Sequence, residues 1–382
     1  MKDNKKGLVP RLRFPEFRDA EEWNDDLVKD LVTTVTPPKK LTSDQYEHEG
    51  MFPVVDQSQE YICGWTNDEH ALVPVESPLI VFGDHTCALK IVDQPFVQGA
   101  DGIKILKSKN VIEPVFLYQY LLFSPVKMES YKRHFSTLKE KLVVYPEKKT
   151  GEQQKIADCL SSLDALIAAQ ADKIDALKTH KKGLMQQLFP REGETVPRLR
   201  FPEFRDAGPW EIKELADALT YEQPGPFIVT TEQYGTSGIP VLTAGKTFIL
   251  GYTSETHGVY EQVPVIIFDD FTTDSKYVDF PFKIKSSAIK ILSAKTGYSL
   301  KFVYEAMTMI RFDAAQHKRH WIGEFQYMVV SFPSLEEQQK IADCLSSLDA
   351  LIAAHTEKLE ALKIHKKGLM QQLFPSPEAI TP

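Results

Sequence analysis

A segment of about forty residues occurs twice in this chain, and each copy has the residue spacing of a long α-helix. Residues 152–190 are EQQKIADCLSSLDALIAAQADKIDALKTHKKGLMQQLFP, and residues 337–375 are EQQKIADCLSSLDALIAAHTEKLEALKIHKKGLMQQLFP. The copies differ only at Gln170/His355, Ala171/Thr356, Asp172/Glu357, Ile174/Leu359, Asp175/Glu360 and Thr179/Ile364. A repeat of this quality means that both halves of the chain contain the same structural element.

The apolar residues of each copy are spaced alternately four and three apart over more than four heptads. This is the a/d pattern of a coiled coil, interrupted only at the polar seam positions Gln170 (His355) and Lys181 (Lys366). At 1.5 Å per residue the seam is roughly 48 Å long, and we expect an intramolecular antiparallel pair that acts as a spacer rod. The predicted seam residues are Ile156, Leu160, Leu163, Ile167, Ile174, Leu177, Leu184, Leu188, Ile341, Leu345, Leu348, Ile352, Leu359, Leu362, Leu369 and Leu373.

Both copies carry signals for the start and the end of a helix. The spacing of a capping box occurs at each start, and a proline follows each end. These residues are Thr150, Gln153 and Pro190 in the first copy and Ser334, Glu337 and Pro375 in the second.

The repeat extends over the whole chain. Val9–Ala20 recurs unchanged as Val196–Ala207, and each copy is followed by a tryptophan, Trp23 or Trp210. Between these connectors and the helices, identity falls but short matching runs survive at a nearly constant offset. The chain is therefore predicted to be a tandem duplication, in which two domains of one fold have diverged in surface. The expected boundaries are 1–21 (connector), 22–149 (first domain), 150–190 (long helix), 191–207 (linker and connector), 208–333 (second domain), 334–375 (long helix) and 376–382 (tail).

Each diverged domain has the pattern of a compact α+β fold, with short apolar runs separated by Gly, Pro and Asp turns. The predicted fold class is two pseudo-symmetric α+β domains separated by a long two-helix antiparallel coiled coil. Expected helices are Asn24–Leu31, Phe116–Phe123, Trp210–Leu219 and Phe302–Met309. Expected strands are Pro78–Phe82, Ile103–Leu106, Leu142–Tyr145, Val263–Phe268, Ala288–Leu292 and Met328–Phe332.

The composition is that of a globular cytoplasmic protein, with 42% hydrophobic and 10% aromatic residues. The sequence has neither an apolar run of transmembrane length nor a secretory segment. The four cysteines, Cys63, Cys87, Cys159 and Cys344, lack metal-ligand spacing and are expected to be reduced packing residues.

Positive charge is concentrated in one segment of each half, although the net charge of −8 argues weakly against a nucleic-acid-binding protein. Residues 104–149 contain 10 bases and 4 acids, and residues 283–320 contain 8 bases and 2 acids. Each segment precedes a long helix. Such clustering favours a surface that faces phosphates, with an ordinary solvated face as the alternative.

These features together resemble the specificity (S) subunits of type I restriction–modification systems. The resemblance rests on Arg13–Phe17 with Trp23, on Arg200–Phe204 with Trp210, and on the EQQKIADCLSSLDALI and KKGLMQQLF helix ends, all in the family's order. It implies two target-recognition domains, each binding half of a bipartite DNA sequence, and helices that set the gap. It also implies a non-catalytic chain that assembles with two modification (M) subunits and two restriction (R) subunits. S-adenosylmethionine, ATP and Mg would then belong to the partners.

Candidate DNA contacts follow from comparing the two halves. The basic tripeptide KRH is retained in both diverged domains, which favours a shared duty such as phosphate contact, with a solvated turn as the alternative. The candidate phosphate contacts are Lys132, Arg133, His134, Lys318, Arg319 and His320. Base readout is expected where polar side chains or their neighbours differ between the halves. These candidates are Gln57, Ser58, Gln59, His85, Thr86, Lys246, Thr247, Phe271 and Thr272.

Two other classes of protein remain as alternatives. One is a duplicated coiled-coil adaptor that binds proteins but not DNA. The other is a self-sufficient methyltransferase or nuclease, and the motifs argue against it. The GKT ending at Thr247 lacks the first glycine of a phosphate-binding loop, because Pro240 stands there. The chain also has no Asn/Asp-Pro-Pro-aromatic motif, and the Asp269–Asp270 pair has Gly83 opposite Asp269 in the first half.

Overall fold

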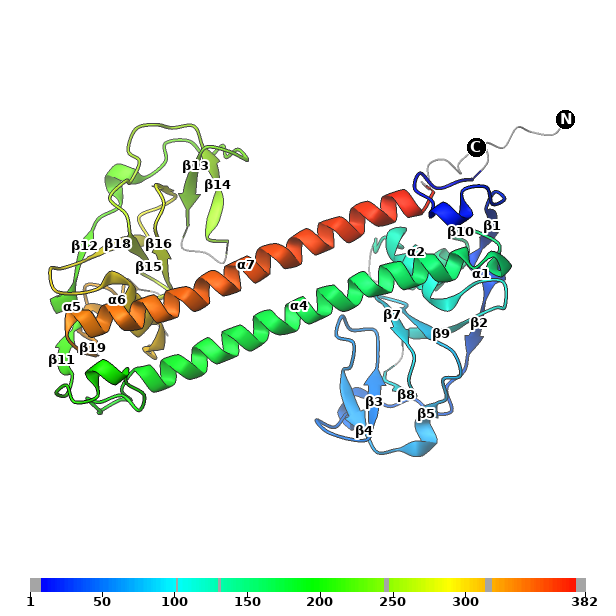
Figure 1. The fold of residues 1–382 in the computed structure, drawn as a ribbon, viewed down its shortest axis with the longest axis horizontal. Helices are drawn as coiled ribbons and strands as arrows, with labels where there is room; N and C mark the ends of the chain where they lie inside the picture. The colour runs from blue at the N-terminus through cyan, green and yellow to red at the C-terminus, as the bar shows by residue number, and fades with distance from the viewer. Residues whose placement is uncertain (1–7, 101, 130–131, 244–246, 313–317, 376–382) are drawn as a thin grey trace. The chain divides into compact units, whose positions relative to one another are not determined.

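The computed structural model describes residues 8–100, 102–129, 132–243, 247–312 and 318–375 (Figure 1). The chain forms two compact units. Unit 1 is Met1–Asp172 with Thr356–Pro382, and unit 2 is Lys173–His355. Each unit therefore contains one diverged domain, part of the helix α4 (Glu152–Leu188) and part of the helix α7 (Leu335–Leu373). Both units are mixtures of helix and sheet, as the sequence predicted.

The diverged domain of unit 1 contains two four-stranded sheets and a two-stranded ribbon, with strand orders β2-β9-β6-β7, β4-β3-β8-β5 and β1-β10. The helix α2 packs on the first of these sheets. The elements are η1 Pro15–Phe17, β1 Asn24–Leu27, α1 Val28–Leu31, β2 Val32–Val35, η2 Ser43–Gln45, β3 Phe52–Val55, β4 Gly64–Thr66, η3 Glu69–Ala71, β5 Leu72–Val73, β6 Leu79–Gly83, β7 Leu89–Val92, β8 Phe96–Gln98, β9 Ile103–Ser108, α2 Pro114–Phe123, α3 Phe135–Lys139, β10 Leu142–Tyr145 and η4 Lys148–Thr150.

Unit 2 has the strand orders β12-β18-β15-β16, β14-β13-β17 and β11-β19, so among the described residues it repeats this topology except that its second sheet has three strands, without a strand in the place of β5. The helix α6 takes the place of α2. The elements are η5 Pro202–Phe204, β11 Glu211–Glu214, α5 Leu215–Ala218, β12 Leu219–Glu222, η6 Gly225–Phe227, β13 Ile239–Leu242, β14 Ile249–Thr253, β15 Val265–Asp269, β16 Ser275–Val278, β17 Lys283–Ile284, β18 Ile289–Ala294, α6 Leu300–Met309, η7 Phe325–Tyr327 and β19 Val329–Phe332.

The central strand of each domain is buried on both faces, which explains its unbroken apolar sequence. Alternate residues of a strand point to opposite faces. In β6, Ile80 and Phe82 therefore join the core that contains α2, whereas Leu79 and Val81 join a separate core on the other face of the sheet. The residues of β15 divide in the same way between two cores of unit 2.

The predicted helices at Asn24–Leu31 and Trp210–Leu219 are wrong in their first halves. Residues 24–27 form a strand that pairs antiparallel with β10, and residues 211–214 pair with β19. Only one helical turn follows each strand. An isolated helix of this length is marginal, so pairing with a distant strand determines the structure. The remaining predicted helices and strands of the two domains are confirmed within a few residues.

Within unit 1, the beginning of α4 lies antiparallel to the end of α7. Ile156 and Leu160 share a core with Leu373, and Asp164, further along α4, is paired with Lys366, which precedes Leu373 in α7. The rings of Phe116 and Tyr120 on α2 pack on the ring of Phe374 at centroid distances of 5.6 and 5.3 Å. The end of the last helix thus completes the core of the first domain.

Unit 2 has the equivalent arrangement with the roles of the helices exchanged. Leu188 shares a core with Ile341 and Leu345, and Lys181 is paired with Asp349. Phe189, which follows α4, stacks on Phe302 of α6 at 5.0 Å. The predicted antiparallel pairing is therefore present within each unit, and every predicted seam residue is buried or half-buried. The cysteines are free.

The predicted capping boxes are not formed. The side chain of Gln153 does not bond to the backbone of Thr150. It accepts a hydrogen bond from Glu113 N at 2.6 Å and donates one to Pro146 O at 2.7 Å. At the second start, Ser334 Oγ accepts from Glu337 N at 3.4 Å, but the carboxylate of Glu337 pairs with Arg200. These side chains are used to dock the helix against its domain. The predicted helix ends are confirmed, since α4 and α7 finish two residues before Pro190 and Pro375.

Candidate nucleic-acid interface

A buried aspartate follows the central strand of each domain and holds the basic segment in place. Asp84 O accepts from His134 N and Asp84 Oδ1 from Phe135 N, both at 2.8 Å. Asp270 accepts equivalent bonds from His320 N at 2.8 Å and Trp321 N at 2.9 Å. We call residues 84–86 and 270–272 the recognition loops, and residues 132–134 and 318–320 the basic segments. Each unit therefore brings one recognition loop against one basic segment.

The two histidines of the basic segments are buried, each with 1% of its surface exposed. His134 Nδ1 lies 3.2 Å from Asp84 O, and its Nε2 accepts a weak bond from Glu129 N at 3.4 Å. His320 Nδ1 lies 2.9 Å from Glu324 Oε2. The prediction that the side chains of His134 and His320 contact phosphates is therefore wrong, because both imidazoles are buried and have partners inside the domain. The pattern KRH alone did not show which side chain points inward.

The other four residues of the basic segments are exposed, as a phosphate contact requires. Lys132 pairs with Glu129, and Lys318 pairs with Glu324. Hydrogen bonds from Lys318 and then from His320 hold the pKa of the Glu324 carboxyl below its usual range. Such exposed pairs contribute little to stability, so both lysines can exchange their carboxylates for phosphates at low cost.

Arg319 connects the second basic segment to its recognition loop. Its guanidinium carbon lies 5.9 Å from the ring centroid of Phe271, and Nη2 donates to Ser287 Oγ at 3.2 Å. Nη1 also lies 4.0 Å from Asp270 Oδ2. The ring, the serine and the aspartate hold the guanidinium at an exposed position, where it can also bind an anion. Phe271 and Arg319, predicted separately as base and phosphate contacts, thus form one surface. Thr272, next in the loop, is exposed.

In unit 1 the predicted readout residues come from two loops that touch. Thr86 Oγ1 donates to Gln57 O at 2.6 Å. The approach depends on glycine, because a Cβ on Gly83 would lie 2.3 Å from Thr86 Oγ1 and one on Gly102, at φ +105°, 2.8 Å from Gln57 Oε1. The amide oxygen of Gln57 is buried in this arrangement. Contact of the Gln57 amide oxygen with a base therefore requires a rotation of the side chain.

The other predicted readout residues of unit 1 lie around this junction. Gln59 is exposed, whereas Ser58 and His85 are half-buried. Ser58 N donates to Asp56 Oδ1 at 2.8 Å, and hydrogen bonds of this kind outweigh the effect of burial and lower the pKa of Asp56. In unit 2, Thr247 is exposed, and Lys246 lies outside the residues that the structure describes.

Several residues that support the interface were missed in the sequence. Tyr46 accepts a hydrogen bond from Ala100 N at 2.8 Å beside the Gln57 loop, and burial raises its pKa to about 12, so it remains a neutral phenol. Lys290 lies against Asp270 Oδ2 at 3.2 Å, with both side chains about 1% exposed. Its counterpart Lys104 is instead half-buried, with Nζ 5.6 Å from the centroid of the Phe135 ring. The sequence signal for this site was that an aspartate stands at the same position in both halves, Asp84 and Asp270.

The start of each long helix was also missed as a structural site. Arg13 Nε and Nη2 donate to the two carboxylate oxygens of Glu152 at 2.7 and 2.6 Å, and Arg200 pairs in the same way with Glu337 at 2.7 Å for both bonds. All four side chains are nearly or fully buried. This bidentate pair explains why the connector and the helix start are kept together in both halves.

No helix in the part of the chain that the structure describes is long and apolar enough to cross a membrane. Within those same residues, no three His, Cys, Asp or Glu side chains are placed to bind a metal ion.

Comparisons with known proteins identify relatives that align with parts or most of the chain. The specificity subunit of the type I restriction enzyme EcoR124I/EcoR124II from Escherichia coli is 44% identical over 174 residues, 42% of this chain and 43% of that protein. The chain thus aligns with less than half the length of this relative. The MjaVIII type I specificity subunit from Methanocaldococcus jannaschii is 22% identical over 94% of this chain and 93% of its own length.

Among solved structures, the S subunit of a type I restriction–modification system from M. genitalium has a similar fold. It has a TM-score of 0.71 at 15% identity and covers 97% of this chain and 100% of its own. The model of the type I restriction modification DNA specificity domain matches residues 20–179 and again residues 208–363. Since these two matches span most of the sequence, the chain belongs to the family of type I restriction–modification DNA specificity proteins, with two copies of the specificity domain.

Proposed function

We propose that this protein is the DNA-recognition subunit of a type I system and binds a bipartite target, with one half-site for each diverged domain. The supporting observation is that each unit has the same aspartate holding a basic segment beside a recognition loop, whereas the loop side chains differ. A retained basic segment suits phosphate contacts that position the domain. Divergent loops suit the reading of two different base sequences. Residues 22–149 and 208–333 would be the two recognition domains.

The proposed phosphate contacts are the exposed members of the basic segments. Lys132, Arg133, Lys318 and Arg319 take this role. The proposed base contacts are His85 and Thr86 with the Gln57–Gln59 loop in unit 1, and Phe271 and Thr272 in unit 2. Lys246 and Thr247 stay candidates for the second half-site.

The long helices would set the number of base pairs between the half-sites. α4 contributes its first residues to unit 1 and its last residues to unit 2, and α7 does the reverse. A change in helix length therefore changes the segment that joins the two recognition domains. Half-sites about one helical turn of DNA apart, ~34 Å, are compatible with a seam of roughly 48 Å.

The chain would act through partners, namely two M subunits that methylate adenine and two R subunits that cleave DNA. S-adenosylmethionine, ATP and Mg would be bound by those subunits, in the cytoplasm. Two identical M subunits need two equivalent contact surfaces. Apolar side chains that are exposed at corresponding positions of both halves support such surfaces: Val9 and Val196, Leu12 and Leu199, and Leu166 and Leu351.

The experiment is to co-express this chain with the M subunit encoded nearest to it and to map methylated adenines across the genome by single-molecule sequencing. The expected result is one bipartite motif with a fixed gap that disappears when this chain is deleted. Methylation that is unchanged by the deletion would contradict the proposal and favour the adaptor alternative. The Asp84→Ala variant tests the first domain by itself, because only the first half-site should then be lost from the motif.

A further inference from the structure

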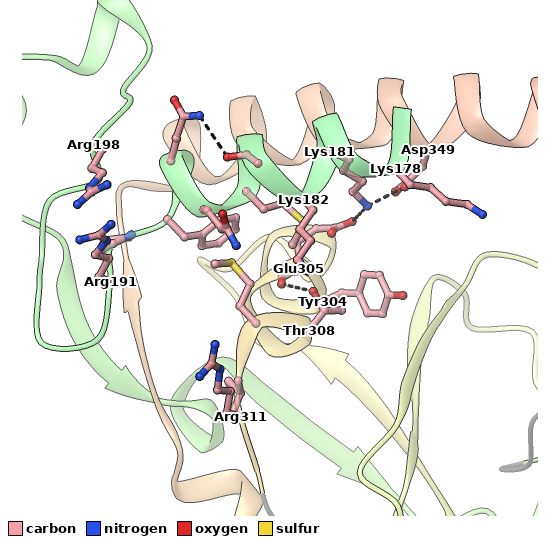
Figure 2. Close-up of a pocket in the computed structure, with 18 of the residues that line it drawn as sticks. Lys178, Lys181, Lys182, Arg191, Arg198, Tyr304, Glu305, Thr308, Arg311 and Asp349 are labelled. Carbon is pink, nitrogen blue, oxygen red and sulfur yellow. Dashed lines mark hydrogen bonds and ion pairs between the residues drawn. The ribbon is translucent and has the colours of Figure 1, made fainter. Parts of the chain in front are cut away.

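Unit 2 contains a strongly basic groove that lies outside its recognition loop. It has a volume of about 1280 Å³ and is bounded by the end of α4, the linker that follows it and the end of α6. Six cationic residues line it, against two carboxylates, Glu305 and Asp349. The cationic residues are Lys178, Lys181, Lys182, Arg191, Arg198 and Arg311. Figure 2 shows these side chains, with Lys181 joined to both carboxylates by ion pairs.

The two carboxylates are already neutralised, so they do not cancel the charge of the groove. Lys181 Nζ lies 3.0 Å from Glu305 Oε1 and 2.7 Å from Asp349 Oδ1. Lys301 Nζ lies 2.9 Å from a carboxylate oxygen of each of the same residues. Two cations therefore balance two anions. The charge that remains is positive and is carried by the other side chains of the groove.

The three arginines of the groove have no ion pair within the part of the chain that the structure describes. Arg191, Arg198 and Arg311 are all exposed. Arg191 and Arg198 lie in the linker that follows α4, Arg311 follows α6, and all three line one cavity. Guanidinium groups bind phosphates through paired hydrogen bonds. A cluster of unpaired guanidinium groups is therefore a surface for a polyanion.

The groove adjoins the second basic segment. Arg311 precedes Phe312, whose ring packs 5.1 Å from the ring of His320 and 5.4 Å from that of Phe325. His320 in turn follows Arg319. Arg311 and Arg319 therefore each precede one of two residues, Phe312 and His320, whose rings pack together. The groove is thus connected to the second basic segment through the contact between the rings of Phe312 and His320.

The groove is not the same in the two units, and this difference selects its ligand. Unit 1 has a smaller cavity at the corresponding place, lined by Lys363, Lys366 and Lys367 with Asp164. Arg198 has the counterpart Arg11, but the positions that match Arg191 and Arg311 are Ser376 and Pro125 in the sequence, so these two arginines are specific to unit 2. A protein partner that binds twice would use residues present in both halves. A continuous DNA duplex meets the two units in different surroundings and imposes no such symmetry.

From these observations we infer that the basic groove of unit 2 binds the phosphate backbone of duplex DNA next to the second half-site, without reading its sequence. This inference rests on the proposed function. The contacts are made by Arg191, Arg198 and Arg311, with Lys178 and Lys182 supporting them. DNA beside the second half-site therefore contributes more to affinity than DNA beside the first.

The test uses the full chain in complex with its M subunit and compares it with the triple variant Arg191→Ala, Arg198→Ala and Arg311→Ala. The measurement is the dissociation constant for a duplex that contains the target, over a range of salt concentrations. Each lost phosphate contact lowers the slope of log affinity against log salt by about 0.9, so the triple variant should lower it by roughly 2 to 3. The methylated motif should be unchanged. The triple lysine variant should keep the slope, and Arg205→Ala, an exposed arginine outside the groove, should behave as wild type.

A second measurement locates the contact. Phosphates flanking either half-site are replaced by neutral methylphosphonates. Neutral phosphates beside the second half-site should weaken binding of the wild type to the level of the triple variant and have no further effect on the variant. Neutral phosphates beside the first half-site should weaken both proteins equally. An unchanged salt slope in the triple variant would overturn the inference, and so would loss of the M subunit from the variant complex, which would indicate a protein-binding groove.

The failure of this inference is distinguishable from the failure of the proposed function. If the wild-type complex binds target and scrambled duplexes equally, the proposed function is wrong. The salt slopes of the wild type and the triple variant can then still be compared on the scrambled duplex. Their difference tests by itself whether the groove binds phosphates.

Discussion

Lys366 Nζ lies 2.6 Å from Asp164 Oδ1, although 202 residues separate them in the chain. The equivalent pair in unit 2, Lys181 and Asp349, has the same contact at 2.7 Å. What differs is the third partner, which comes from the diverged domain. In unit 1 the neutral Gln119 donates to Asp164 Oδ2 at 2.7 Å. In unit 2 the matching residue is Glu305, and Lys301 has been added beside it. Each domain therefore meets the same helix residues with its own balanced charge.

The first prediction concerns this charge balance. Glu305→Gln leaves Lys181 and Lys301 with one carboxylate at a site where Glu305 is almost fully buried, and it should destabilise unit 2 by roughly 2–4 kcal/mol. Adding Lys301→Val reproduces the arrangement of unit 1, which has Gln119 and Val115, and should recover most of the loss. Hydrogen exchange at α6 measures both effects. A double variant as unstable as the single variant would contradict the prediction.

The second prediction concerns the aspartates that hold the basic segments. Asp84→Ala leaves the amide of Phe135 without its acceptor and should cost about 1–3 kcal/mol in local stability. Binding to the first half-site should weaken, while the second half-site is bound as before. Asp270→Ala should give the reverse pattern. Asp84→Asn keeps an acceptor oxygen and serves as the control. Binding is measured on duplexes in which one half-site is scrambled, and equal losses on both half-sites would contradict the prediction.

The third prediction concerns Arg319. Arg319→Ala should lower the slope of log affinity against log salt by about 0.9 and should weaken binding to target and scrambled duplexes by the same factor, because a phosphate contact carries no sequence information. Lys276→Ala removes an exposed charge from β16 of the same unit and should leave the slope unchanged. A variant that changes the methylated motif instead would show that Arg319 contacts a base.

The fourth prediction concerns acid stability. A hydrogen bond from Lys283, followed by bonds from Thr230 and Thr231, outweighs desolvation and lowers the pKa of Glu255 to about 2. A carboxyl with a depressed pKa stabilises the fold above its unfolded pKa of about 4.3, and this contribution is lost as the pH falls toward 2. Glu255→Gln should therefore reduce the change in the free energy of unfolding of unit 2 between pH 4.5 and pH 2, the range over which this carboxyl titrates.

The matched control for this acid titration is Glu261→Gln, a change of an exposed glutamate in the same unit. Urea unfolding at several pH values gives the comparison. The hypothesis about Glu255 fails if both variants keep the wild-type dependence on pH below 4.5.

The fifth prediction concerns the length of the helices. Four residues inserted into both α4 and α7 add ~6 Å of helix. The gap between the two methylated half-sites should then lengthen by about two base pairs, at 3.4 Å per base pair along a strand. An insertion into one helix alone puts the two seams out of register and should reduce methylation at every site. A double insertion that leaves the recognised gap unchanged would exclude the helices as the spacer.

The heptad pattern and the internal repeat were sufficient to predict the two long helices and the fold class. They depend on local spacing and on identity between the halves, both of which are visible in one sequence. The strand at Asn24–Leu27 was missed because it forms only through pairing with residues 142–145. The burial of His134 was missed for the same reason, since its partner Asp84 lies 50 residues away.

The DNA contacts of the candidate site stay predictions. The lysines and arginines of the basic segments and Thr272 are exposed, and Thr86 and Phe271 are half-buried. The contact between Arg319 and Phe271 was not predictable, because it depends on how two loops meet. The groove arginines were not predicted either, since Arg191 and Arg198 lie in the linker after α4, Arg311 follows α6, and only the fold brings them together.

The packing of Phe374 on Phe116 and Tyr120 has a consequence for synthesis on the ribosome. The second unit is continuous in the sequence, so all of its residues exist before translation ends. The first unit begins earlier but obtains the last part of its core only when the C-terminal helix has been made. A chain that terminates before residue 369 can thus complete its second domain and leaves the rings of α2 in the first domain uncovered. The N-terminal domain should be the last to mature and the first to suffer from premature termination.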